Sequence, residues 1–209
     1  MEYVPRRLEE YAERYTTVHA DVFDRLRDET SALPNAGMSV GPLEGAFLSF
    51  MVTLKQPQLV LEIGTFTGWS SIAMALALPG GGRLISCDLD EETTAIARRY
   101  AEEAGVADRI AYMLGDARET VDRLDGPFDL VFIDGLKAQY VDYYEAVLPK
   151  LADGGVIMAD NTLFGLSDGE IAEHMTRFNE HVRADARVEA TLVTIREGVT
   201  LIRQRRAAS

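Results

Sequence analysis

An apolar run that ends in a glycine-bearing turn decides the fold of this chain: Leu59-Val60-Leu61-Glu62-Ile63-Gly64-Thr65-Phe66-Thr67-Gly68-Trp69-Ser70. The apolar residues predict a buried strand, and the two glycines let the backbone turn tightly and approach a ligand closely before a helix begins. No lysine follows Gly68, as a GxxxxGK[ST] phosphate loop requires, and Phe66 stands where a GxGxxG motif has its second glycine. The stretch therefore predicts a strand, a ligand-binding turn and a helix, without either of these phosphate-binding motifs.

The same alternation of short apolar runs and helical patterns continues along the chain. The runs are Leu59–Ile63, Arg83–Cys87, Arg109–Leu114, Phe128–Ile133 and Val156–Ala159, and the helical patterns cover 69–78, 91–104, 117–123 and 138–148. This order is typical of βαβ units, and it predicts a parallel sheet that is buried on both faces. After a helix near 168–183, the segments Arg187–Ile195 and Val199–Arg203 are joined by a three-residue turn that makes a hairpin. One strand of this last pair must therefore run antiparallel to the sheet.

Two helices precede the first strand. Apolar residues at spacings of three and four predict one amphipathic helix that buries its stripe; they are Leu8, Tyr11, Tyr15, Val18, Val22 and Leu26. After the turn-rich segment 33–42, Pro42 suits the first residue of a second helix, with Leu43, Phe47, Met51 and Leu54 on one face. We expect residues 1–55 to form a helical cap on a core of residues 56–209, within a single domain.

Composition limits the classes of partner. The chain has 209 residues, enough for one domain with a sizeable core. Its 21 Lys and Arg against 34 Asp and Glu give a net charge of −13, which disfavours nucleic acid and anionic membranes. No apolar run approaches the ~18 residues of a membrane span, and the basic run Arg203-Gln204-Arg205-Arg206 is expected to be a solvated tail. The first ten residues do not resemble a signal peptide and Cys87 is the only cysteine, so we expect a cytoplasmic protein.

Acids end four of the apolar runs. They are Glu62, Asp88, Asp134 and Asp160, the last of which is followed by Asn161. Each could act only as a helix N-cap, but the carboxyl ends of parallel strands share one edge of the sheet, where ligands bind. Together they favour a polar site. Asp88 stands where nucleotide-binding sheets place an acid on ribose hydroxyls, so a nucleoside without a pyrophosphate fits the pattern.

At this point the chain resembles the metal-dependent S-adenosylmethionine O-methyltransferases, the family of catechol and caffeoyl-coenzyme A O-methyltransferases. The motifs that carry the resemblance are Glu62 to Ser70, Cys87-Asp88-Leu89-Asp90, Gly115-Asp116-Ala117, Phe132-Ile133-Asp134-Gly135-Leu136-Lys137 and Asp160-Asn161-Thr162-Leu163-Phe164-Gly165. It covers nearly the whole chain from Met38 onward. It implies a Rossmann-like, seven-stranded α/β sheet with an antiparallel last strand, which agrees with the hairpin inferred from the residues.

The resemblance also implies site residues. Positions that match the cofactor site for S-adenosylmethionine are Val40, Glu62, Gly64, Thr65, Ser70, Asp88, Asp116, Ala117 and Asp134. Those that match ligands of Mg²⁺, or of another divalent cation such as Mn²⁺ or Ca²⁺, are Asp134, Asp160 and Asn161, which are hard oxygen donors. Positions that would contact a hydroxylated aromatic acceptor are Met38, Lys137, Asn161 and Phe164. The scattered histidines His19, His174 and His181 offer no zinc site and are expected at the surface.

The resemblance further implies a mechanism and a homodimer. A phenol with a pKa of about 10 is a poor nucleophile at neutral pH, and chelation of a vicinal diol by a divalent cation lowers that pKa. Lys137 matches the family's general base and acts beside Asp134, provided that its amine is neutral. Catalysis is then mostly orientation of the oxygen toward the sulfonium methyl group.

Two departures and three alternatives remain open. Gly135-Leu136 follows Asp134 where relatives often have a second acid, and the loop after Phe164 is short, which favours a small acceptor over a coenzyme A thioester. The same ligands could serve a hydroxamate instead of a catechol. A catalytically silent cofactor-binding subunit is a non-enzymatic alternative, which the presence of Lys137 disfavours. A dinucleotide-dependent dehydrogenase is the third alternative, and it is disfavoured because the glycine turn of this chain does not have the GxGxxG motif.

Overall fold

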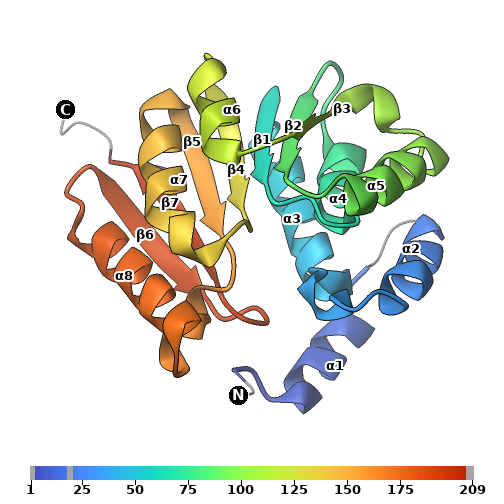
Figure 1. Cartoon of the computed structure of the whole chain (residues 1–209), viewed down its shortest axis with the longest axis horizontal. Coiled ribbons are helices and arrows are strands. Elements are labelled where there is room, and N and C mark those ends of the chain that lie inside the picture. Colours follow the sequence, from blue (N-terminus) through green and yellow to red (C-terminus); the bar gives the residue numbers. More distant parts are fainter. Residues whose placement is uncertain (1–2, 18–20, 206–209) are drawn as a thin grey trace.

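The computed structural model describes residues 3–17 and 21–205, and in this part of the chain one sheet of seven strands forms the centre (Figure 1). Its order is β3-β2-β1-β4-β5-β7-β6. The strands are β1 (Leu59–Ile63), β2 (Arg83–Asp88), β3 (Ile110–Leu114), β4 (Phe128–Ile133), β5 (Leu151–Ala159), β6 (Val188–Val193) and β7 (Val199–Gln204). The first five pair in parallel, and β7 runs antiparallel to both β5 and β6. The predicted fold class is confirmed.

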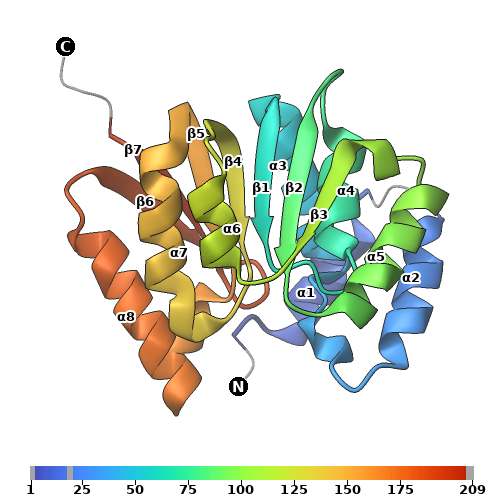
Figure 2. The same ribbon diagram turned by 45° about the horizontal axis from the view of Figure 1, so that its top comes forward.

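Helices cover both faces of the sheet (Figure 2). One face carries α2 (Val22–Ser31), α3 (Gly41–Lys55), α4 (Trp69–Ala77) and α5 (Glu91–Glu103), and the other carries α6 (Ala117–Arg123), α7 (Tyr140–Val147) and α8 (Glu170–Ala184). Short 3-10 helices, η1 to η5, cover Ala36–Met38, Ala107–Arg109, Lys137–Gln139, Leu148–Lys150 and Thr162–Leu166. Along β4, Leu130 and Phe132 pack toward the first layer, whereas Val131 and Ile133 pack toward the second. Burial on both faces explains why the strands are apolar throughout.

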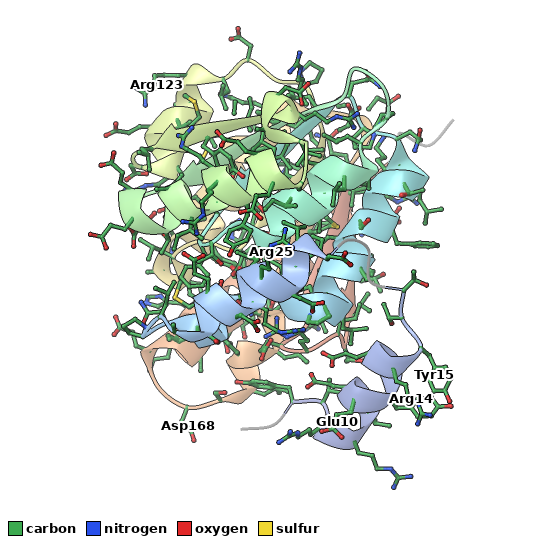
Figure 3. All side chains as sticks on the ribbon, turned by 90° about the vertical axis from the view of Figure 1, so that its right-hand side faces the viewer. Glu10, Arg14, Tyr15, Arg25, Arg123 and Asp168 are labelled. Atoms are coloured by element: carbon green, nitrogen blue, oxygen red, sulfur yellow. The ribbon has the colours of Figure 1, made fainter. Side chains whose placement is uncertain are left out.

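The N-terminal region departs from the prediction of one amphipathic helix. The structure has α1 (Arg6–Arg14) and, separately, α2, while Val18 lies outside the described residues. Val22 and Leu26 are buried, but α1 buries no residue. Leu8, Tyr11 and Tyr15 are 58%, 65% and 68% exposed, and Figure 3 shows Tyr15 pointing away from the rest of the structure. Periodicity reveals an apolar face, but it does not say whether the same chain covers that face.

Helix α3 buries a face that overlaps the predicted one only in part. Its fully buried residues are Glu44, Gly45, Leu48 and Val52. The predicted Phe47 and Met51 are half-buried against the core, whereas the predicted Leu54 is exposed. Close packing explains this shift, because an added Cβ at Gly45 would lie 2.5 Å from Trp69 Nε1. The glycine thus sets which side of α3 meets α4, and an apolar residue could not replace it there.

By length and composition, 36–55 also satisfies the criterion for a membrane-spanning helix, as a helix packed in a protein core can.

The prediction of a solvated basic tail is wrong for one of its residues. Arg203 belongs to β7 and pairs with Glu189 of β6, whereas Arg206 lies outside the described residues.

Candidate active site

Loops at the carboxyl ends of the parallel strands enclose a cavity of about 660 Å³. Hydrogen bonds step from one strand end to the next: Asp134 N donates to Ile63 O at 2.7 Å, and Asp160 N donates to Ile133 O at 3.0 Å. These bonds fix the start of each loop relative to its neighbour. They bring the acids that follow β4 and β5 to one wall, as their positions in the sequence predict.

The cavity is lined by all but one of the predicted site residues. Those that line it are Met38, Val40, Gly64, Thr65, Ser70, Asp88, Asp116, Ala117, Asp134, Lys137, Asp160, Asn161 and Phe164. They come from the segment before α3, from the ends of β1, β2, β4 and β5, and from the starts of α4 and α6. The structure therefore brings together segments that are more than a hundred residues apart.

Glu62 is the exception. It is fully buried in β1, and its Oε2 accepts a hydrogen bond from Ser86, whose hydroxyl also pairs with that of Thr65. Burial raises the pKa of Glu62 to about 8, although the hydrogen bonds to its carboxylate favour the charged form and so act to lower the pKa. In this structure Glu62 supports the glycine turn from behind and does not face the cavity.

The glycine turn is held by Asp88. One oxygen of this carboxylate accepts hydrogen bonds from Thr65 N at 2.7 Å and Phe66 N at 2.8 Å. The turn then passes so close to the end of β4 that an added Cβ at Gly64 would lie 2.1 Å from Asp134 O. With φ at +102°, only glycine fits at position 64.

Asp116 has two roles. It is the N-cap of α6, where its side chain accepts from Arg118 N at 2.8 Å, and it also lines the cavity. Hydrogen bonds from Arg118 lower the pKa of this carboxyl, so Asp116 is an anion at neutral pH. A capping acid can therefore remain available to a ligand.

Lys137 is held in place by two groups. Its Nζ lies 2.7 Å from Asp134 Oδ1 and 2.7 Å from the hydroxyl oxygen of Tyr140, which itself donates to Ile133 O. Burial, and then the charge of Asp134, raise the pKa of Tyr140 well above its ordinary value. Tyr140 is thus a neutral acceptor for the lysine. No pattern in the sequence indicates this role, because Tyr140 has the spacing of an ordinary core residue of α7.

A second acid, not predicted, lies near Asp160. Glu44 of α3 is fully buried and its Oε1 has no hydrogen-bond partner among the described residues. Burial and the negative charge of Asp134 raise the pKa of Asp160, while burial and the charges of Asp160 and Asp134 raise that of Glu44. Three acids therefore lie at this end of the cavity, and the charge of Asp134 disfavours ionisation of both Asp160 and Glu44.

The donor set at this end fits a hard divalent cation. Asp134, Asp160 and Asn161 all offer oxygen, and the crowded negative charge would be relieved by a cation. No group of three or more His, Cys, Asp or Glu residues in the described chain is arranged to hold a metal ion by itself. The predicted set differs from such a group because its third ligand is an amide.

Several lining residues were not predicted. His174, expected at the surface, is half-buried on α8 and lines the cavity beside Ile171 and Glu170, and Arg196 of the β6–β7 turn lines it too. His181 is half-buried and its Nε2 lies 2.7 Å from Glu145 Oε1, whereas His19 is outside the described residues. The position of His174 along α8, near the buried Met175 and Phe178, could have indicated that this residue is partly buried. It could not have indicated that the residue also lines a cavity.

The sequence and structure match known proteins over nearly their whole length. The model of a family described as O-methyltransferase matches residues 13–205. The chain belongs to this O-methyltransferase family. A caffeoyl-CoA O-methyltransferase of Stellaria longipes is 33% identical over 196 residues, which cover 86% of this chain and 81% of that protein. A catechol O-methyltransferase of Niastella koreensis is 34% identical over 186 residues, covering 81% and 83%.

A solved structure supports the cofactor. The O-methyltransferase from Bacillus cereus in complex with S-adenosylhomocysteine (SAH) superposes with a TM-score of 0.85, at 26% identity, covering 95% of this chain and 97% of that one. The protein is therefore an S-adenosylmethionine-dependent O-methyltransferase.

Proposed function

We propose that the protein methylates one of two neighbouring hydroxyls on a small aromatic acceptor, with the help of a divalent cation. The observation that carries the proposal is the shared cavity wall of Asp134, Lys137, Asp160 and Asn161. This wall joins the cavity of the glycine turn, so an acceptor there is next to the cofactor. Relatives named for caffeoyl-CoA and catechol substrates also support a phenolic acceptor.

Asp134, Asp160 and Asn161 are the residues that would hold Mg²⁺, or Mn²⁺ or Ca²⁺ in its place. When bound, a divalent cation lowers the pKa of a coordinated hydroxyl and orients it. Asp160 is 2% exposed, so it has little access to water and gains the most from a cation. The proposal therefore assigns the buried carboxylate of Asp160 to the metal and not to substrate recognition.

Lys137 accepts the proton of the acceptor hydroxyl. Its Nζ is held by Asp134 and Tyr140 on a wall where the lysine side chain is only 16% exposed. The amine must be neutral when it accepts the proton, and it carries the charge afterwards. When bound, S-adenosylmethionine would supply the methyl group to the acceptor oxygen, with SAH as the leaving group. The chain contributes position and proton transfer, because the cofactor already supplies the leaving group.

Apolar side chains favour an aromatic acceptor. Met38, Leu136, Phe164 and Ile171 line the cavity, and the first two are 60% and 52% exposed. Such side chains at the mouth gain by covering a ring with apolar surface. The short loop after Phe164 supports a small acceptor over a coenzyme A thioester.

Acceptors with the same ring but one or two hydroxyls test the proposal. We expect methyl transfer to catechol and no detectable transfer to phenol, because only the diol offers two neighbouring oxygens. Equal rates on the two would contradict a chelating acceptor. Transfer to a hydroxamate but not to catechol would place the protein with other bidentate acceptors.

We propose a homodimer in the cytoplasm, with α1 and α3 at the interface. Exposed apolar side chains on these two neighbouring helices support it, namely Leu8, Tyr11, Tyr15, Phe50 and Leu54. Light scattering after gel filtration tests it, with Tyr11→Glu as the disrupting variant and Glu10→Gln on the same helix as control. A monomer in the unmodified chain would contradict the dimer.

A further inference from the structure

The turn between β6 and β7 reaches across the molecule to the start of α3. Arg196 in this turn donates from Nη1 to Ser39 O at 2.9 Å and to Val40 O, and the same nitrogen lies 3.4 Å from Glu44 Oε2. The guanidinium therefore binds two successive carbonyls and a buried acid. Charged donors make the stronger hydrogen bonds in proteins, so this one side chain fastens the segment that leads into α3.

The backbone of the same turn is fastened to the loop after β5. Thr162 N donates to Gly198 O at 3.0 Å, and Leu163 N donates to Glu197 O at 2.8 Å. These residues directly follow Asp160 and Asn161 in the chain. The turn thus bridges two walls of the cavity, with its backbone on the β5 loop and its Arg196 side chain on the segment before α3.

The conformation of Arg196 is unfavourable in itself. Its φ is +47°, in the left-handed region where a residue with a Cβ is strained. Such strain persists only where the surrounding contacts hold it, and it gathers at functional sites. Glycine would adopt this backbone without strain, so the side chain of Arg196 must contribute more than the strain costs.

The position along the sheet says which part of the cofactor this wall faces. Asp88, the predicted ribose ligand, follows β2, whereas the Arg196 turn is bound to the loop of β5, and β1 and β4 lie between. Three strand spacings separate the two ends, or about 14 Å. The turn therefore holds the Ser39–Val40 wall from the end of the cavity away from Asp88, and a cofactor with its ribose at Asp88 would extend its amino-acid part toward this wall.

We propose that Arg196 is a positioning residue for the cofactor, which holds the Ser39–Val40 wall against the amino-acid part of S-adenosylmethionine. Arg196 acts through the two carbonyls and need not contact the cofactor. This inference rests on cofactor binding by the family, and it is independent of the proposed metal and acceptor. Its failure would leave the proposed function untouched.

Two ligands that differ only in the amino-acid part test the inference. Calorimetry measures the Kd of SAH and of 5′-methylthioadenosine, which keeps the adenosine and sulfur but carries a methyl group in place of the amino-acid chain. For Arg196→Gly, which also removes the strain, we expect the Kd of SAH to rise about tenfold. The Kd of methylthioadenosine should stay within about twofold, and Arg196→Lys should recover part of the SAH affinity.

The matched control is Arg203→Ala, on the same hairpin, where the arginine is half exposed and pairs only across β6 and β7 with Glu189. It should change neither Kd. Loss of Arg196 leaves Glu44 without its cation. If this lowers the melting temperature strongly, both Kd values are measured instead on the double variant Arg196→Gly with Glu44→Gln. Equal weakening of both ligands, or an unchanged Kd of SAH in a folded variant, would overturn the inference.

Discussion

Lys137 Nζ lies 2.7 Å from Asp134 Oδ1, and both side chains are about five-sixths buried in the cavity wall. The two residues are three positions apart, at the end of β4 and the start of η3. In the proposed reaction, the lysine takes the acceptor's proton and the acid holds the lysine and the cation. Each residue can be tested separately.

Replacing Lys137 should slow chemistry without weakening cofactor binding. We expect Lys137→Ala to lower kcat by about 10²-fold or more and to shift the pH dependence of the rate upward, since a general base contributes about that much. Lys137→Arg keeps the charge but cannot accept a proton, and should be equally slow. The measurements are pH–rate profiles and the Kd of SAH. An unchanged profile in Lys137→Ala would mean that the acceptor loses its proton without the lysine.

The hydroxyl group of Tyr140 should be the part of this side chain that affects the reaction rate. Tyr140→Phe removes one of the two groups that hold Lys137, and we expect kcat to fall about tenfold with KM nearly unchanged, because loss of orientation acts on the chemical step. Tyr144→Phe is the control, because Tyr144 lies on the same helix and donates to Asp185 instead. A loss of equal size in both variants would point to a general disturbance of α7.

Asp160 should be required for the metal and not for the cofactor. We expect Asp160→Ala to abolish metal-dependent turnover and to weaken Mn²⁺ binding, followed by electron paramagnetic resonance, by about tenfold or more. The Kd of SAH without metal should remain within a few fold. Full activity of Asp160→Ala would remove the metal role from this residue.

Glu62 should make the metal-free, ligand-free protein less stable as pH rises. Burial raises its pKa to about 8, so between pH 5 and 8 the folded state keeps a proton that the unfolded state has lost. The free energy of unfolding therefore falls as pH rises through this range. We expect Glu62→Gln to reduce that fall by about 3 kcal/mol, measured by urea unfolding at both pH values. The exposed Glu189→Gln should leave the slope unchanged, and an equal slope in Glu62→Gln would contradict the assignment.

The packing of α3 against α4 should depend on the absence of a side chain at Gly45. Gly45→Ala places a methyl group 2.5 Å from Trp69 Nε1, and we expect a loss of about 1–3 kcal/mol of unfolding free energy. Gly80→Ala, where an added Cβ meets nothing within 4 Å, is the control. If Gly45→Ala unfolds with the same free energy as the unmodified protein, Trp69 has room to move.

Much of the fold could be predicted from sequence because its strands and helices differ in period. The apolar runs located β1 and β4 at their bounds, and the turn of Arg196, Glu197 and Gly198 required an antiparallel strand. The predicted face of α1 was wrong and that of α3 was wrong in part, for one reason. Apolar periodicity does not reveal which side a neighbour approaches, and at α3 this is decided by the absence of a side chain at Gly45.

The candidate site was partly predictable for a similar reason. Asp134, Asp160 and Asn161 end strands, and the rule for parallel sheets places such residues on one edge. No such rule covers Tyr140, Glu44 and Arg196, because they reach the site from the first residue of a helix, from a helix of the cap and from a distant hairpin. Glu62 was expected at the cofactor, but the alternation of side chains along β1 places it on the same face of the sheet as Val60, where it is fully buried.

The most direct test of the central claim is methyl transfer from S-adenosylmethionine to catechol, followed as SAH formation, with EDTA and then with excess Mg²⁺. The proposed chemistry predicts turnover that EDTA stops and Mg²⁺ restores. Turnover that continues at an undiminished rate in EDTA would contradict a metal-dependent reaction.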